Sequence, residues 1–142
     1  MAEALKEARK AFDMGEIPVG AVITVNGKII ARAHNLTETL TDVTAHAEMQ
    51  ALTAASHQLG SKYLPECTLY VTLEPCPMCA GALYWSQIGR VVYAASDEKR
   101  GYHCIHPNML HPKTETLQGI QEATAAQLLR DFFIRLRKQK GL

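Results

Sequence analysis

The sequence predicts an α/β fold in which helices cover both faces of a central five-stranded mixed sheet. Two observations predict this three-layer arrangement. Helical segments alternate with short β-branched runs along the 142 residues, which is typical of layered α/β domains. The first two runs flank Asn26-Gly27, a strong hairpin signal, whereas strands that are joined through a helix should pair in parallel. The length is that of one ordinary domain, so we expect residues 1–142 to form one domain.

Local signals predict where each element begins and ends. Apolar residues at helical spacing predict a first helix over residues 2–14, and Gly15 is a candidate for its C-cap. Thr44 is a plausible N-cap for a second helix that runs to about Gly60. A third helix should begin after a strand and a proline and end at Gly89. The expected strands are 19–25, 28–33, 67–73, 90–95 and 115–118, and a last helix is expected over about 121–139.

Composition narrows the class of protein. Hydrophobic residues make up 47% of the chain and charged residues 20%, close to the globular average. There is no run of about 18 apolar residues and no signal-peptide pattern at the start, so we expect a soluble cytoplasmic protein with no membrane partner. The formal net charge of +1 argues mildly against a general nucleic-acid binder.

Positive charge gathers at the end of the chain. The last thirteen residues hold one acidic residue, Asp131, against several basic ones: Arg130, Arg135, Arg137, Lys138 and Lys140. Such an ending is either a solvated helix end, favourable for the helix dipole, or a surface for an anionic partner.

Histidine, cysteine and glutamate stand at two expected helix N-termini, where parallel strands end and functional groups gather. Cys76 and Cys79 are three residues apart in a first helical turn, whose partial positive charge favours thiolates. With His46 they would form a Cys2His zinc set that leaves one position open for water. Glu48 is two residues from His46, so on a regular helix it would point elsewhere and serve as a base rather than a ligand.

Two other interpretations of the cysteines stay open. A thioredoxin-like redox pair would leave His46 and Glu48 without a role. A structural zinc site would need a fourth ligand, for which Cys67, Cys104 or a loop histidine are candidates. Cys67 is more simply a small buried residue at the start of a strand. The sequence assigns no role to Cys104 or to the loop histidines His103, His106 and His111.

The stretches HAEMQAL and TLYVTLEPCPMCAGAL resemble the zinc-dependent cytidine and adenosine deaminases, and within that superfamily the bacterial branch that acts on tRNA. The resemblance implies a cytidine deaminase-like fold, one Zn²⁺ per subunit and zinc ligation by His46, Cys76 and Cys79. It implies that Glu48 is the proton shuttle and that a zinc-activated water converts adenosine to inosine at the wobble position of a tRNA anticodon loop. Members of this branch are homodimers, so we expect a homodimer that binds an anticodon stem-loop.

The resemblance also implies contacts with the substrate. The residues that match substrate-binding positions are Asn35, Ala47, Pro75, Asp97 and Phe133. The polar and aromatic residues of this set each have an ordinary structural role as the alternative. Asn35 could cap a polar loop, Asp97 and Lys99 could form a simple turn, and one of the two phenylalanines Phe132 and Phe133 should belong to the core.

Two functions from other classes remain open on the sequence. A small-molecule nucleobase or nucleoside deaminase, of the guanine or cytosine type, would share the zinc chemistry. Tyr84-Trp85 is similar to a feature of guanine deaminases, although we expect Trp85 to pack in the core. A non-catalytic, zinc-stabilised binding module would instead need four protein ligands and would not depend on Glu48.

Overall fold

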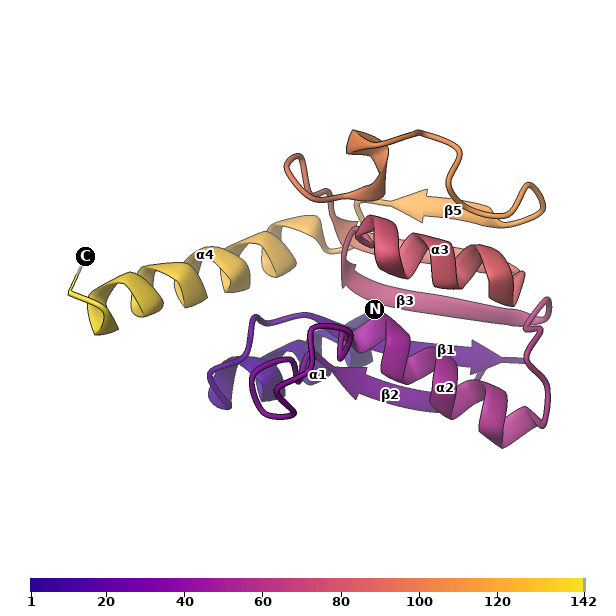
Figure 1. Ribbon diagram of the computed structural model, residues 1–142, viewed down its shortest axis with the longest axis horizontal. Coiled ribbons are helices and arrows are strands. Elements are labelled where there is room, and N and C mark those ends of the chain that lie inside the picture. Colours follow the sequence, from indigo (N-terminus) through magenta and orange to yellow (C-terminus); the bar gives the residue numbers. More distant parts are fainter. Residues whose placement is uncertain (142) are drawn as a thin grey trace.

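The computed structural model describes residues 1–141 of the chain and contains one five-stranded sheet within that range (Figure 1). The strands lie in the order β2-β1-β3-β4-β5. Their bounds are β1 Gly20–Val25, β2 Lys28–His34, β3 Cys67–Leu73, β4 Arg90–Ala95 and β5 Glu115–Gln118. The helices are α1 Ala2–Asp13, α2 Ala47–Leu59, α3 Pro77–Ser86 and α4 Glu122–Gln139, with a short 3₁₀ turn at Tyr102–Cys104.

The sheet is mixed, as the sequence predicts. Strand β1 pairs antiparallel with β2 and with β3, whereas β3, β4 and β5 pair in parallel. The prediction that strands joined through a helix pair in parallel was wrong for β2 and β3. They are joined through α2 and run in the same direction, but β1 lies between them and pairs with both. The carboxyl ends of β2, β3, β4 and β5 therefore share one edge of the sheet, and this is the edge at which α2 and α3 begin.

Helices cover both faces of the sheet, which confirms the three-layer prediction. Helices α2 and α3 lie side by side over one face (Figure 1). Small side chains of α2, among them Ala47, Ala51 and Ala55, are fully buried there and allow the helix to approach the strands closely. On the other face Leu5 of α1 and Ala125 of α4 pack with the end of β4. Beyond this contact, α4 extends away from the sheet (Figure 1).

Most predicted bounds agree with the structure within a few residues, and Gly15 follows α1 with φ +80°, a conformation that suits glycine. Two boundary predictions were wrong. The N-cap of α2 is His46, and the Thr44 hydroxyl donates to Asp42 instead. Helix α3 ends at Ser86, because Gln87 adopts a left-handed conformation with φ 53°.

None of the helices within residues 1–141 is long and apolar enough to cross a membrane.

Candidate active site

His46 and the two cysteines of α3 form a compact group. His46 precedes α2 with φ −71° and ψ 154°, and Cys76 precedes α3 with φ −72° and ψ 169°, so both are extended rather than helical. Because His46 stands outside the helix, the helical spacing to Glu48 does not constrain its ring. Pro77 occupies the first position of α3, where a missing N–H costs little, and Cys79 follows in the first turn.

The potential ligand atoms face one another. His46 Nδ1 lies 3.6 Å from Cys76 Sγ and 3.5 Å from Cys79 Sγ. All three atoms lie within 4.8 Å of one another, and among residues 1–141 no other group of three His, Cys, Asp or Glu side chains is this close. One metal ion can therefore contact all three.

The structure does not favour either alternative for the cysteines. Cys67 is buried at the start of β3, whereas the cluster lies beyond the end of that strand. Cys104 is exposed, and its thiol donates to the Glu98 carbonyl at 2.8 Å. Neither belongs to the cluster, so the part of the chain that is described offers three protein ligands and not four. His46 also lies against the cysteine pair, which a simple redox motif does not require.

Proton affinities in the cluster depend on each other. The contact with Cys79, followed by the contact with His46, lowers the pKa of the Cys76 thiol to about 4 although burial opposes this. The contact with the Cys76 thiolate, together with burial, raises the pKa of Cys79. The pKa of His46 is raised, first by its hydrogen bond with Cys76. The contact with the negatively charged Cys76 thiolate and burial together oppose ionisation of the Cys79 thiol. A divalent cation bound to both sulfurs would offset this negative charge, so the donor set fits a metal ion.

Glu48 stands two residues after His46 and is almost fully buried, with 4% of its surface exposed. Burial raises the pKa of Glu48 to about 7, and a contact with Cys79 partly offsets the effect. A carboxyl group that gains and loses a proton near neutral pH is suited to general acid–base catalysis. Its position in the first turn of α2 keeps it beside the cysteines.

The buried carboxylate of Glu16 holds the loop that leads into His46. Glu16 is 0% exposed, and its carboxylate accepts hydrogen bonds from the Thr39 N–H at 2.6 Å, the Thr39 hydroxyl at 2.7 Å and the Glu38 N–H at 3.1 Å. Asn35 is buried where this loop begins, and its side-chain oxygen accepts from the Thr37 N–H at 3.3 Å. Asn35 therefore has the capping contact that was its alternative role. Sequence reasoning missed Glu16.

The remaining predicted substrate residues occupy different surroundings. Ala47 and Pro75 are buried beside the cluster ligands in sequence, and the Pro75 carbonyl accepts from the Tyr102 N–H at 2.9 Å. Asp97 makes an ordinary turn contact, since its carboxylate accepts from the N–H groups of Lys99 and Arg100 at 3.2 and 3.0 Å. The structure thus ties Pro75 to the loop that carries Asp97, and sequence reasoning had not connected them.

The two phenylalanines of α4 have separated roles. Phe132 is buried and packs edge-on against Phe12 of α1, with ring centroids 6.0 Å apart. Phe133 is exposed, so it is the one free to contact a partner. Arg135 belongs with Phe132: its guanidinium lies 4.1 Å from the centre of the Phe12 ring and donates to the Phe12 carbonyl at 2.7 Å.

The expectation that Trp85 packs in the core was wrong. Trp85 is 75% exposed on α3, and the neighbouring Tyr84 is 39% exposed. The two rings pack edge-on at 5.4 Å. The chain thus presents two large aromatic side chains to its surroundings on the same helix that carries Cys79.

Comparisons with known proteins agree with this site. The chain matches the family model of MafB19-like deaminases over residues 1–137. It is 48% identical to the tRNA-specific adenosine deaminase of Bacillus subtilis (strain 168), over 99% of this chain and 90% of that protein. A solved structure from a study of A-to-I editing by tRNA:A34 deaminases is similar with a TM-score of 0.84 and 41% identity, over 91% of this chain and 97% of that one.

A guanine deaminase structure from Bacillus subtilis is also similar, with a TM-score of 0.66 and 34% identity over 92% of this chain and 90% of that one. Its lower TM-score and identity place this chain nearer to the tRNA branch. The chain therefore belongs to the deaminase family that includes the bacterial tRNA-specific adenosine deaminases.

Proposed function

We propose that this protein converts adenosine to inosine at the wobble position of a tRNA anticodon loop. The observation that carries the proposal is the meeting of His46, Cys76 and Cys79 next to a buried Glu48. Three ligands leave room for a reacting water, and the buried carboxyl group supplies a proton carrier. The tRNA substrate is supported by the relatives described above, whose names specify tRNA adenosine deamination.

We propose that the metal is zinc, one ion per chain, held by His46, Cys76 and Cys79. Tetrahedral zinc bonds of about 2.3 Å to sulfur and about 2.0–2.1 Å to nitrogen separate these atoms by about 3.6 Å. The observed distances from His46 Nδ1 to the two sulfurs, 3.6 and 3.5 Å, fit this geometry. Two thiolates and a neutral imidazole would also balance the charge of the ion.

The chemistry assigned to this chain's residues concerns proton transfer. When bound, zinc would polarise a water molecule for attack on C6 of the adenine ring. Glu48 would accept a proton from that water at its carboxylate, deliver it to the purine ring, and then assist the departure of ammonia. Burial raises the pKa of Glu48 in the chain itself, and a carboxyl group with a raised pKa can return the proton that it has accepted. The burial of Glu48 keeps solvent from competing for the proton.

The substrate contacts in this proposal come from three loop segments and from helices α2 and α4. The assigned residues are Asn35, Ala47, Pro75, Asp97 and Phe133. An anticodon-loop base is already unpaired, so it costs little to turn it out toward the buried carboxyl group. Asp97, on the exposed loop after β4, would border the RNA strand, and Phe133, exposed on α4, would contact a base.

We further propose that the protein works as a homodimer of one-domain chains. The exposed Tyr84 and Trp85 support a second copy on α3, because large exposed aromatic groups often mark an interaction surface. The four cysteines, all within residues 1–141, are free thiols, which fits a reducing compartment and supports a cytoplasmic location.

The test is inosine formation by the purified, zinc-loaded protein on an anticodon stem-loop with adenosine at the wobble position. Guanine, cytosine and cytidine are assayed beside it for release of ammonia. We expect inosine in the RNA and no ammonia from the free compounds. Ammonia from guanine with the RNA unchanged would move the protein to the small-molecule branch, and activity on neither would contradict a deaminase.

A further inference from the structure

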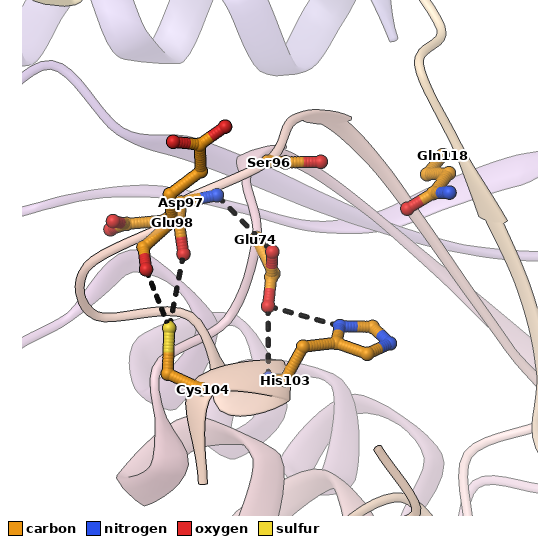
Figure 2. A pocket seen from close by; sticks show the side chains of 7 residues that line it. All are labelled: Glu74, Ser96, Asp97, Glu98, His103, Cys104 and Gln118. Carbon is orange, nitrogen blue, oxygen red and sulfur yellow. Dashed lines mark hydrogen bonds and ion pairs between the residues drawn. The ribbon is translucent and has the colours of Figure 1, made fainter. Parts of the chain in front are cut away.

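A second buried carboxylate lies directly beside the metal-binding segment. Glu74 follows the last residue of β3, precedes Pro75-Cys76 and is 5% exposed. Figure 2 shows its side chain pointing into the loop after β4, between Asp97 and His103. The three residues help to line a pocket of about 410 Å³.

The carboxylate of Glu74 has three hydrogen-bond donors, all from this loop. Its Oε1 accepts from the Asp97 N–H at 3.1 Å. Its Oε2 accepts from the His103 N–H at 3.1 Å and contacts His103 Nδ1 at 3.1 Å (Figure 2). Two of the three donors are main-chain groups, so the carboxylate determines the path of the loop backbone and not only the position of one side chain.

The loop is shaped to receive this carboxylate. A Cβ atom at Gly101 would collide with Glu74 Oε2, so a residue without a side chain stands where the loop passes closest. The Gly101 N–H in turn donates to the Asp97 carbonyl at 2.9 Å. The Asp97 N–H thus donates to the Glu74 carboxylate, and the Asp97 carbonyl accepts from the Gly101 N–H.

Other contacts hold the loop only in part. The Asp97 carboxylate and the Cys104 thiol bond to groups within the loop itself, so they shape it without placing it. The buried Tyr102 anchors its far end, through the N–H group that donates to Pro75. At the near end the Glu74 N–H donates to the Ala95 carbonyl at 2.8 Å, and Asp97, two residues later, is attached to the segment before Cys76 through the Glu74 side chain.

We propose that Glu74 is a positioning residue that presents Asp97 to the RNA strand at a fixed distance from the metal-binding segment. The inference rests on the proposed RNA-editing function, in which Asp97 borders the substrate. It assigns to Glu74 a contribution to RNA binding, separate from metal binding, which depends on His46, Cys76 and Cys79. A purely structural glutamate would affect folding stability alone.

The test compares Glu74→Gln with a matched control, Thr72→Val. Glutamine has the same shape but one acceptor oxygen, so the N–H of either Asp97 or His103 loses its partner. Thr72 lies on β3, which ends one residue before Glu74, is 1% exposed and accepts from the Gly20 N–H at 3.1 Å, away from the loop. Each variant therefore removes an acceptor from a main-chain N–H, which is buried for Gly20 and part-buried for Asp97 and His103.

For Glu74→Gln we expect the KM for the anticodon stem-loop to rise at least about tenfold, equivalent to about 1.4 kcal/mol. We expect kcat within about threefold of wild type, one zinc per chain, and faster amide hydrogen exchange at Asp97 and His103. Thr72→Val should lower the melting temperature but leave the KM and these two amides unchanged. Gly101→Ala, which pushes on the same carboxylate from the loop, should reproduce the higher KM.

The inference would be overturned by a wild-type KM in Glu74→Gln, by an equal rise of KM in Thr72→Val, or by loss of zinc in Glu74→Gln. If Glu74→Gln does not fold, Glu74→Asp, whose carboxylate is one methylene shorter, decides between the same outcomes, because the Cβ of Gly101→Ala would also press directly on the Asp97 carbonyl. A wild-type protein that edits no RNA would overturn the proposed function instead. In that case hydrogen exchange at Asp97 still shows whether Glu74 holds the loop, and unchanged exchange in Glu74→Gln would overturn the inference too.

Discussion

The buried glutamates Glu48 and Glu16 differ in how many hydrogen-bond donors surround them, and this difference indicates a different role for each. Glu48 is buried with few donors, and burial raises its pKa to about 7. Burial also acts on Glu16, but hydrogen bonds from Thr39 and Glu38 outweigh it and leave its pKa below the ordinary value. A carboxyl group with few donors exchanges protons near neutral pH, whereas one with several stays ionised and holds structure.

Replacement of Glu48 tests the first role. In Glu48→Ala we expect kcat on the stem-loop to fall by a factor of about 100 to 10,000, because the proton carrier is gone. Zinc should stay at one ion per chain, since Glu48 is not among the three cluster ligands. The melting temperature should not fall much, because the removed carboxyl group was disfavoured in its charged form by burial. Zinc content, circular dichroism and single-turnover rates measure these outcomes. Loss of zinc would identify Glu48 as a ligand.

Replacement of Glu16 tests the second role through its pH dependence. The pKa of Glu16 in the folded protein lies below 4.5, so its ionised form favours folding above that pH. This contribution is lost as the pH falls through the folded-state pKa. In Glu16→Gln we expect the free energy of unfolding at pH 7 to fall by about 1–3 kcal/mol, with a smaller deficit below pH 4.5.

Urea unfolding of both proteins at several pH values measures this difference. Comparing the two proteins at each pH cancels the titration of the cysteines, His46 and the other acids, which both share. A deficit that stays constant from pH 7 to pH 4 would show that Glu16 does not act through its charge.

At the scale of elements, periodicity and hairpin chemistry predicted the strands and helices, because these depend on neighbours in sequence. The loops depend on contacts across 20 to 30 residues and could not be predicted in that way. Glu16 binds a loop 22 residues later, and Glu74 binds loop residues 23 and 29 positions later. The Thr44 prediction failed for a different, local reason: Asp42, two residues earlier, accepts from the Thr44 hydroxyl, and the helix starts later.

Helix α4 shows that residues grouped by charge in the sequence can divide in the structure. The basic ending was interpreted as one surface, but Arg135 packs on Phe12 and Phe132 and donates to the end of α1. Arg137 and Lys138 are exposed. We therefore separate Arg135, which attaches α4 to α1, from Arg137 and Lys138, which remain available to phosphate groups.

This division predicts two different phenotypes. In Arg137→Gln/Lys138→Gln we expect weaker RNA binding and a salt dependence of log K less steep by about 2, about one unit for each lost phosphate contact. Arg135→Gln should instead lower the free energy of unfolding by about 1–2 kcal/mol, because a cation–π contact and a hydrogen bond are lost. Fluorescence anisotropy across a salt series and urea unfolding measure the two effects. An unchanged slope in the double variant would make its residues a solvated helix end only.

At the scale of the whole molecule, the crossover rule explains why the site could be predicted as a set. His46 and Cys76 are 30 positions apart, yet each precedes a helix that follows a strand ending at the same sheet edge. The sequence therefore predicted both the group and its place. Of the substrate residues, Ala47 and Pro75 adjoin the cluster ligands, whereas Asn35, Asp97 and Phe133 follow no such rule because they lie on loops and on α4. The substrate roles of all five remain predictions.

The exposure of Trp85 depends on how helix α3 packs in the whole molecule, and the sequence alone predicted the opposite. Helix α3 is apolar on most sides, which for a buried helix predicts a core position for Trp85. The structure places it outside, on the face of α3 turned away from the sheet. In the proposed homodimer we expect this side chain, which is 75% exposed in one chain, to be buried against the second copy.

The predicted dimer can be broken at this helix. In Trp85→Glu we expect sedimentation equilibrium to give the mass of one chain, where the wild type gives twice that mass, because a charge replaces an apolar contact at the interface. Ile134→Glu is the matched control: Ile134 is 44% exposed, but on α4, across the sheet from α3. It should leave the mass doubled.

If the partner subunit helps to bind RNA, the Trp85→Glu monomer should keep its zinc while its KM for the stem-loop rises about tenfold or more. A monomeric wild-type protein would contradict the dimer. A monomeric Trp85→Glu variant with an unchanged KM would show that each chain binds RNA without help from a partner subunit.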